Sequence, residues 1–532
     1  MLPKKPDEIV DRDEDWKILE RFARPSPIGT PGSGVAALAG RRRTGKSYLL
    51  QRFADATGGF YFEARLEETL AEAQERFREE LITYDPSRAA ELSALSVAAH
   101  GTWDRLLKIA MDATFSRSEG NRIPPFVIDE FPYLLRDTPH LQSIVKSVYD
   151  TRSFRRGEIG KPGIRVGYYD RLIEGRMLLC GSAMSVIHEL GHGSRPLFGR
   201  LTFQLTVDPF DHVDMARFWG IEDRRVAFTL FAALGGAPGY RDPLMERTGL
   251  PVPQTMEELD AWLTEALLRP QPRFFTEAEI DRLLHEDPRI TDKDIYRQAM
   301  KAISEGNATL TKIGGAIGRA KDETDGIVAR LVAMRYVDEW RDLLRPRDYL
   351  FRLNDPIVRF HHAVVESCMR DVARGATTPD DAWRDAQQRF RSQVIGPVFE
   401  QIATWSAFRL LYNRTDLGSD GWALVPDPAN RTTHEVDYIG LAHNTSGRPK
   451  GSTITVIGET KATERPRGLK DLERLRHVRA LLAKDHKAEN AVLAIFSMHG
   501  FSEHLRQAEK EAPDEIALFD LDDVYSYREP SF

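Results

Sequence analysis

Short apolar runs alternate with longer charged or amphipathic stretches in the first part of the chain. The apolar runs predict strands at 35–39, 60–62, 126–128 and 177–180, and the charged stretch at 67–80 predicts a solvated helix. Strands that are apolar throughout and separated by helices are typical of a parallel sheet with helices on both faces. The pattern therefore predicts an α/β fold for this region.

The pattern changes twice further along the chain. Residues 213–288 are mostly helical in pattern, with an interruption at the glycines and proline of 235–239. Three helices and two short strands then predict a winged helix-turn-helix, after which mixed α/β patterning returns from about residue 382. The helices are expected at 295–304, 310–319 and 322–334, the two short strands at 336–340 and 349–353, and the later strands at 435–441, 453–458 and 491–496.

These changes divide the chain into four predicted domains. They are a P-loop parallel-sheet core at 1–210, a helical lid at 211–290, a winged helix at 291–362 and a second α/β domain at 363–532. A chain of 532 residues has room for three or four domains at roughly 150 residues each.

Composition narrows the possible classes of protein. Apolar residues make up 41% and charged residues 29%, a globular balance that excludes wholesale disorder and a collagen-like rod. We find no run of about 18 apolar residues and no apolar signal core, so we expect neither a membrane span nor export. Cys180 and Cys368 lie far apart, which favours a reduced, cytoplasmic location. Because the net charge is −7, any contact with DNA must come from local basic patches.

A phosphate-binding motif directly follows the first strand. The sequence GRRRTGKS at 40–47 matches G-x-x-x-x-G-K-[ST], and a helical pattern begins after it. Glycines such as Gly40 and Gly45 let backbone N–H groups point at phosphates, while Lys46 reaches the β and γ oxygens and Ser47 places its hydroxyl on Mg²⁺. An ordinary glycine-containing turn is the less favoured alternative.

A second motif ends the strand at 126–128. This strand is followed by Asp129 and Glu130. In a parallel sheet this strand end lies beside the phosphate loop, so Asp129 is predicted to hold Mg²⁺, directly or through water. Glu130 is predicted to polarise the attacking water. The two motifs together predict magnesium-dependent hydrolysis of a nucleoside triphosphate.

Three further polar residues are candidates for contacts with the γ-phosphate. Ser182 follows the strand at 177–180 and could sense the γ-phosphate or cap the next helix. Arg195 and Arg200 could act on developing phosphate charge, in this chain or from a neighbouring subunit, which makes a homo-oligomer possible. Both arginines could equally be ordinary surface residues.

Over roughly residues 15–360 the chain resembles the archaeal-type ATPases, P-loop proteins related to the AAA+ and STAND groups. The matching segments are GRRRTGKS, IDEFPY, CGS, PLFGR and GGAPGY. The resemblance implies ATP as the nucleotide and a winged helix after the lid. It also implies that Arg200 matches a family arginine and that Pro238 lies near the adenine. The stretch Thr151–Asp170 is longer and more basic than the family's usual connection and is either a DNA-facing loop or a solvated insertion.

The predicted winged helix has an unfavourable charge for reading DNA. Its presumed recognition helix begins with Asp322, Glu323 and Asp325, which would repel phosphates, whereas its arginines come later, toward the wing. Direct DNA binding and a purely interdomain role are both open.

The second α/β region carries a group of acidic residues and a lysine. Glu459 and Lys461 end the strand at 453–458 and, two residues apart, share a strand face that could meet Asp437 on the preceding strand. Such carboxylates can hold Mg²⁺ while Lys461 orients a water or stabilises a pentavalent phosphate. Glu400, on a predicted helix upstream, could add a third acid.

This order of residues resembles the PD-(D/E)XK nuclease superfamily, especially its Holliday-junction-resolvase-like members, over roughly residues 382–532. The resemblance implies a restriction-endonuclease-like fold in which Asp437 and Glu459 carry the metal, Lys461 is catalytic and Glu400 is an accessory acid. A surface hairpin with a Glu459–Lys461 salt bridge and a degenerate, inactive nuclease domain are the alternatives.

The sequence therefore predicts an ATP- and Mg²⁺-dependent ATPase coupled to a DNA endonuclease-like domain. A nucleotide-gated switch whose C-terminal domain binds a DNA or protein partner without cleaving is the alternative, and a repair or maintenance motor is a third possibility. His361, His362 and His434 have no second metal ligand at a useful spacing, so we expect them to be core or surface histidines.

Overall fold

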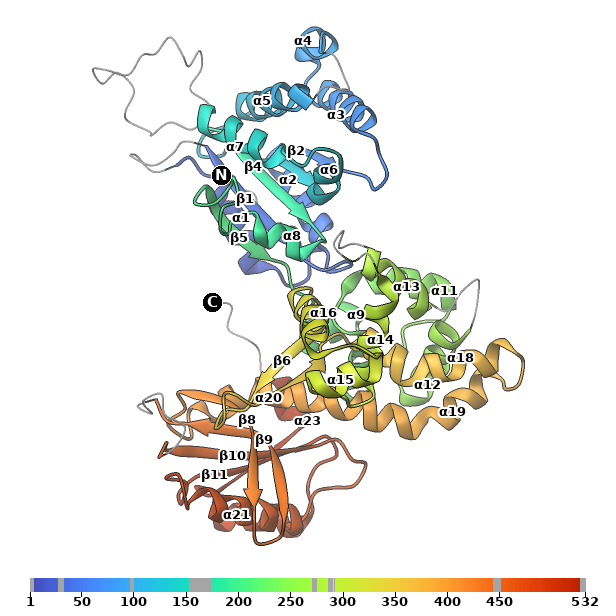
Figure 1. Cartoon of the computed structure of the whole chain (residues 1–532), viewed down its shortest axis with the longest axis vertical. Helices are drawn as coiled ribbons and strands as arrows, with labels where there is room; N and C mark the ends of the chain where they lie inside the picture. The colour runs from blue at the N-terminus through green and yellow to red at the C-terminus, as the bar shows by residue number, and fades with distance from the viewer. Residues whose placement is uncertain are drawn as a thin grey trace.

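The computed structural model describes residues 4–26, 33–95, 100–152, 174–269, 275–285, 290, 292–443 and 451–526. The first sheet and the last sheet lie at opposite ends of an elongated molecule, and the helical middle of the chain lies between them (Figure 1). Within the described ranges, no helix is long and apolar enough to cross a bilayer.

The first sheet is parallel throughout, which confirms the predicted α/β fold. Its five strands run in the order β2-β3-β4-β1-β5. The four predicted strands are all present, while β5 was missed because its side chains alternate between half-buried and exposed at the sheet edge. The bounds are β1 Gly34–Ala39, β2 Phe60–Glu63, β3 Phe126–Asp129, β4 Arg176–Gly181 and β5 Leu201–Thr206.

Alternate residues of the central strands supply two separate cores. Val35 and Ala37 of β1 pack with β3 and helices on one face, while Ala36 and Leu38 pack on the other face with the helix that follows the phosphate loop. This two-sided burial explains why the strands are apolar throughout. The helices here are α1 Asp13–Phe22, α2 Lys46–Thr57, α3 Leu70–Tyr84, η1 Pro86–Arg88, α4 Ala89–Ser93, α5 His100–Ser116, α6 Phe131–Asp137, α7 Leu141–Arg152 and α8 Met184–Glu189.

A helical lid follows the first sheet. The backbone N–H of Phe210 donates to the carbonyl of Gly236 at 2.8 Å, which ties the entry into the lid to the turn after its second helix. The lid comprises α9 His212–Trp219, α10 Arg224–Leu234, η3 Pro238–Tyr240, α11 Arg241–Thr248, α12 Met256–Leu263, the π-helical turn η4 Thr264–Leu268 and α13 Phe275–His285.

Three helices and a two-stranded antiparallel sheet lie where the sequence predicts a winged helix-turn-helix. The helices are α14 Lys293–Ser304, α15 Leu310–Ile317 and α16 Lys321–Ala333, and the strands are β6 Val337–Arg341 and β7 Tyr349–Leu353. The acidic start of α16 is exposed, in keeping with its sequence: Asp322, Glu323 and Asp325 all face solvent.

The chain then continues in helices that pack on the lid before the second sheet begins. The domain boundary expected at 362/363 falls inside an uninterrupted helical run, 356–373, whose apolar side packs against α10 and α13. The helices are α17 Pro356–Phe360, η5 His361–Val365, α18 Glu366–Ala373, α19 Pro379–Phe390, η6 Arg391–Ile395 and α20 Gly396–Tyr412.

The second sheet has five strands in the order β12-β11-β10-β9-β8. The pairs β8–β9 and β9–β10 are antiparallel, as expected for a hairpin, and β10–β11 and β11–β12 are parallel. The elements are β8 Ser419–Asp427, β9 Thr432–Leu441, β10 Ile454–Lys461, α21 Leu469–Leu482, β11 Val492–Ser497, α22 Glu503–Glu511, β12 Ile516–Asp520 and α23 Leu521–Ser526.

We predict that Gly236→Ala destabilises the entry into the lid. A Cβ at Gly236 would lie 1.7 Å from the carbonyl oxygen of Phe210, so the backbone must move. We expect a loss of about 1–3 kcal/mol, measured as a lowered apparent melting temperature. Gly326→Ala in α16 is the matched control, because a Cβ there meets nothing within 4 Å and should stabilise the helix by about 0.5–1 kcal/mol. Equal melting temperatures for both variants would contradict the expectation.

Candidate functional site

The phosphate-loop motif forms the turn between β1 and α2. Gly45 has φ of 86° directly before the first helical residue, Lys46, a conformation that favours glycine. A Cβ on Gly40 would lie 2.9 Å from the carbonyl oxygen of Val207, so the close approach of these two backbones also requires glycine. The loop therefore has the local geometry that its sequence predicts.

Lys46 lies against both carboxylates of the second motif. Its Nζ is 3.3 Å from Oδ1 of Asp129 and 3.2 Å from Oε1 of Glu130, and its side chain is 5% exposed. Strand order explains this contact: β4 alone separates β1 from β3, so the carboxyl ends of all three parallel strands meet at one edge.

Ser182 lies at the same edge of the sheet, directly after β4. Its backbone N–H and its hydroxyl both donate to Oε2 of Glu130, at 3.1 and 3.0 Å. Ser182 therefore orients Glu130, and the strand that carries it lies between the two motif strands, as the sequence predicts.

Asp129 is completely buried and is held in its charged form. Burial opposes ionisation, but the charge of Lys46 and hydrogen bonds from the Ser47 and Tyr61 hydroxyls outweigh it, so the pKa of Asp129 is below its ordinary value. Ser47 and Asp129, the two predicted Mg²⁺ residues, are thus in contact. Tyr61 was not expected at this site: its hydroxyl donates to Oδ2 of Asp129 at 2.8 Å because β2 lies beside β3, a strand order that the sequence does not reveal.

The lid packs directly on the phosphate loop. The ring of Pro238 lies close to Gly45 of the loop: a Cβ added to Gly45 would be 3.5 Å from it. The turn at 235–239 therefore contacts the phosphate loop. Arg43 of the loop forms a two-bond ion pair with Glu279 of α13, at 2.8 and 3.0 Å, and donates to the carbonyl of Gly239 at 2.9 Å.

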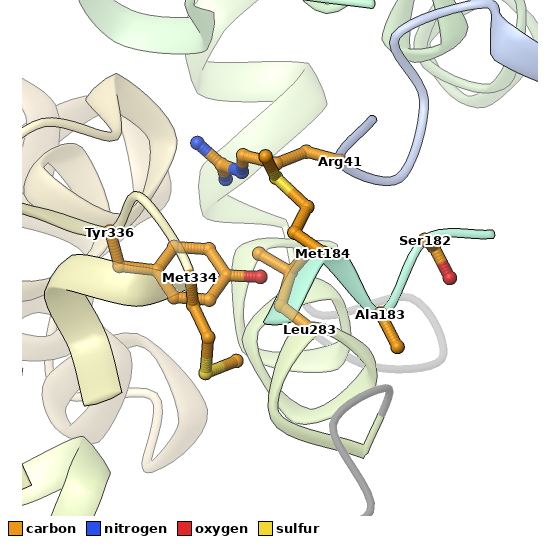
Figure 2. A pocket seen from close by; sticks show the side chains of 7 residues that line it. All are labelled: Arg41, Ser182, Ala183, Met184, Leu283, Met334 and Tyr336. Atoms are coloured by element: carbon orange, nitrogen blue, oxygen red, sulfur yellow. The ribbon is translucent and has the colours of Figure 1, made fainter. Parts of the chain in front are cut away.

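The winged helix also reaches the phosphate loop. Arg41 forms an ion pair with Asp355, directly after the wing, and its guanidinium lies 4.5 Å from the ring centre of Tyr336. Figure 2 shows Arg41 and Tyr336 around a small gap with residues from the end of β4 and from α13. The gap encloses only about 10 Å³, space for about one water, so the loop, lid and winged helix are closely packed.

Arg195 and Arg200 each pair with a nearby acid. Arg200 forms a two-bond ion pair with Asp150 of α7 at 2.9 and 3.2 Å, and Arg195 pairs with Glu189 at 2.6 Å. The structure does not bring either arginine to Lys46, so their action on phosphate stays a prediction. Of the basic stretch Thr151–Asp170, residues 153–170 lie outside the described residues.

A second pocket lies between the winged helix and the C-terminal sheet. It encloses about 480 Å³. Glu400, Asp437, Glu459 and Lys461 all line it, so the structure brings together the four residues that the sequence singled out in this region. Glu400 comes from α20, Asp437 from β9, and the other two from β10.

Asp437 sits at an irregularity of β9. Gly421 of β8 pairs with Ile439 of β9, and Ala423 of β8 pairs with Val436. One residue of β8 therefore faces two residues of β9 between these pairs, which is a β-bulge that includes Asp437. Burial, with the negative charges of Glu459 and Glu400, raises the pKa of Asp437 to about 7. Three carboxyl groups that repel each other in a partly buried pocket form a site that a divalent cation would stabilise.

Basic side chains balance these acids. Glu459 pairs with Lys461 and with Arg474 of α21, and Glu400 pairs with Arg352 of β7. Arg352 also contacts Glu435 at 2.8 Å, so a residue of the wing reaches into the pocket. Arg352 and Arg474 were not expected here, because each lies on an element that only tertiary packing brings to the strand end.

A short segment connects the two sites. Arg352 contacts the acidic pocket and Asp355, three residues later, contacts Arg41 of the phosphate loop. Between them, Asn354 accepts a hydrogen bond at 3.0 Å from Gln401, the neighbour of Glu400 on α20. Segment 352–355 is therefore in contact with both candidate sites.

Comparisons with known proteins show only distant similarity. No protein-family model matches the chain. The chain is 19% identical over 400 residues to the uncharacterized protein MJECL04 of Methanocaldococcus jannaschii, covering 74% of this chain and 76% of that protein.

Solved structures with some similarity to the chain include two ORC proteins and a STAND protein. The Aeropyrum pernix ORC2 protein, in ADPNP–ADP complexes, has a TM-score of 0.42 and 13% identity. The match covers 71% of this chain and 97% of the ORC2 chain. The A. pernix ORC1 protein in complex with DNA has a TM-score of 0.32 and 14% identity, and the match covers 69% of this chain and 95% of the ORC1 chain. A Pyrococcus horikoshii STAND protein with a tetratricopeptide repeat sensor has a TM-score of 0.28 and 11% identity, and the match covers 77% of this chain and 53% of the STAND chain. At these scores we draw no functional argument from the likeness.

Proposed function

We propose that this protein is a magnesium-dependent ATPase that controls a C-terminal DNA endonuclease-like domain. The observation that carries the proposal is that segment 352–355 joins a phosphate loop to a pocket in which Glu400, Asp437, Glu459 and Lys461 converge. The buried, unbridged cysteines, Cys180 and Cys368, suit the cytoplasmic location that the sequence predicts.

The N-terminal site has the side chains that ATP hydrolysis needs. The loop between Gly40 and Gly45 offers backbone N–H groups to phosphates, and Lys46 is positioned to bind the γ-phosphate. Ser47 and Asp129, which contact each other, would hold Mg²⁺, and the ion would neutralise phosphate charge. Glu130, oriented by Ser182, would accept a hydrogen bond from the attacking water.

The C-terminal pocket has the side chains of a metal-dependent phosphodiesterase. Asp437 and Glu459 supply the oxygen ligands that Mg²⁺ prefers, with Glu400 as an accessory acid. Lys461 is placed beside Glu459 and would stabilise negative charge on the phosphate. The pocket's volume of about 480 Å³ and its position beside the wing suit a DNA backbone segment.

Charge explains how nucleotide could control the second site. A triphosphate brings negative charge to the loop that carries Arg41, and this charge competes with Asp355 for the guanidinium. A shift of Asp355 moves the segment that carries Arg352, which holds Glu400 and Glu435. Nucleotide binding would thus change which charges the acidic pocket presents.

A non-cleaving, nucleotide-gated switch is the second candidate, and one observation favours it. Glu400 and Glu459 are paired with arginines in the structure, as in a site that is stable without a metal ion. In this candidate function the pocket binds a DNA or protein partner and never cuts. Self-association in which Arg200 acts on a neighbouring subunit stays a prediction. The third function, a repair or maintenance motor, also stays a prediction.

We predict that Glu130→Gln abolishes hydrolysis but not binding of ATP. The amide keeps the shape of the carboxyl group but cannot take up a proton, so turnover should fall about 10²–10⁴-fold in a phosphate-release assay. Lys46→Ala should lose ATP binding as well. Glu503→Gln, the same change at an exposed position of α22, is the control. Wild-type turnover in Glu130→Gln would refute the hydrolytic role.

Lys461→Ala tests the nuclease assignment. With Mg²⁺ and branched, linear or single-stranded DNA, we expect wild-type cleavage and a loss of about 100-fold or more in the variant, because the charge beside the scissile phosphate is gone. Lys484→Ala, an exposed lysine on the same domain, should cut normally. If the wild type binds DNA without cutting it, the switch replaces the nuclease; if Lys461→Ala cuts as fast as the wild type, the assignment is wrong.

Asp355→Asn tests the coupling between the two sites. Asparagine keeps the cap of α17, where Asp355 accepts from the Val358 N–H, but loses the charge that pairs with Arg41. A non-hydrolysable ATP analogue should change the DNA affinity of the wild type about 5-fold or more and leave that of the variant unchanged. Asp223→Asn, the same change at the cap of α10, should respond like the wild type.

A further inference from the structure

Three metal-binding side chains converge at the tip of the β8–β9 hairpin, apart from the acidic pocket. Asp427 ends β8, His434 lies on β9, and His477 projects from α21. One ligand atom of each lies within 4.8 Å of the other two. No second ligand for His434 was expected at a useful spacing in the sequence, because its partners come from other elements, β8 and α21.

The two imidazoles point at the same carboxylate oxygen of Asp427. The Nε2 atoms of His434 and His477 lie 3.3 and 2.7 Å from Oδ2 of Asp427. The Asp427 side chain is 0% exposed, whereas those of His434 and His477 are 20% and 45% exposed. A buried carboxylate therefore lies beneath two imidazoles that solvent, and an ion, can reach.

The carboxylate is also held in place from behind. Asn430, in the hairpin turn, donates its backbone N–H to Oδ1 of Asp427 at 3.2 Å and its side-chain amide to Oδ2 at 2.8 Å. Such supporting hydrogen bonds are a regular feature around metal-binding carboxylates.

The spacing suits a small tetrahedral ion. Zinc binds imidazole and carboxylate ligands at about 2.0–2.2 Å, which places ligand atoms about 3.4 Å apart in a tetrahedral site. The His434–Asp427 distance already matches this spacing, whereas the shorter contact of His477, the most exposed of the three, has to lengthen. Two imidazoles and one carboxylate favour zinc or a similar transition metal over Mg²⁺.

A second cluster lacks these features. His361, His362 and Glu366 also have ligand atoms within 4.8 Å of one another. Lys301, however, donates to Glu366 at 2.6 Å, and His361 is already bonded to the hydroxyl of Thr276 at 2.9 Å. A cation at Glu366 would have to displace the ammonium group of Lys301, and both histidines are buried, so this cluster is already satisfied as a hydrogen-bonded and ion-paired group.

We propose that Asp427, His434 and His477 form a transition-metal site of the zinc class, with one position open to water. The ion would fasten the β8–β9 hairpin to α21. These elements carry Glu435 and Arg474, whose side chains reach into the acidic pocket, so the ion would fix the position of both. The proposal does not depend on ATP hydrolysis or DNA cleavage.

The test is metal binding by the full-length protein. After treatment with a chelator, the protein is loaded with Zn²⁺ or Co²⁺ in excess Mg²⁺, desalted and analysed for metal content, and Co²⁺ is also followed by its visible absorption. We expect one tightly bound ion per chain, and His434→Ala and His477→Gln each to weaken binding at least tenfold. His504→Ala, an exposed histidine of α22, should bind like the wild type.

Two further measurements keep the result unambiguous. Glu459→Gln, which alters the acidic pocket, should retain the Co²⁺ spectrum, so loss of the spectrum there would assign the ion to the other site and overturn the proposal. Zn²⁺ should raise the melting temperature of the wild type but not of His477→Gln, which also reports whether the variant folds. A wild type that retains no ion, or histidine variants that retain it, would show that the cluster is only hydrogen-bonded.

Discussion

The buried charge of Lys46 is the constraint on which the N-terminal half of the molecule depends. An ammonium group that is 5% exposed is stable only beside compensating charge, and Asp129 and Glu130 supply it. These carboxylates reach the lysine because β3, β4 and β1 are adjacent and parallel. The charge of Lys46 is thus balanced by Asp129 and Glu130, and an incoming phosphate would alter this balance. The strand order, the glycine turn and Ser182 together hold these three side chains in place.

The same physical rule organises the C-terminal pocket, with the signs reversed. There the buried groups are acids, and the compensating cations come from β10, from α21 and, through Arg352, from the wing. Arg41 of the phosphate loop is likewise paired across a domain boundary, with Asp355, so segment 352–355 supplies one charged partner to each site. The two candidate sites are therefore linked by ion pairs as well as by the polypeptide.

The sequence predicts elements that are strongly patterned and contacts that follow from strand order. The apolar strands β1, β3 and β4, and the meeting of Asp437, Glu459 and Lys461, belong to this class. Edge strands such as β5 lack a continuous apolar run and were missed. Side chains from elements distant in sequence, such as Arg352, Tyr61 and His477, could not be placed, because their contacts depend on tertiary packing. The boundary predicted at 362/363 lies within a helical run for the same reason: the helices that follow it pack on the lid and share its core.

That shared core has an architectural consequence. Phe399 of α20 stacks edge-on against Phe228 of α10 with ring centres 5.9 Å apart, and the other side of α20 covers the strands of the second sheet. One helix thus packs against both the lid and the second sheet. Cutting the chain between these two parts would expose an apolar surface on each fragment. The lid, the winged helix and the C-terminal sheet therefore share one continuous hydrophobic core instead of being separate units joined only by linkers.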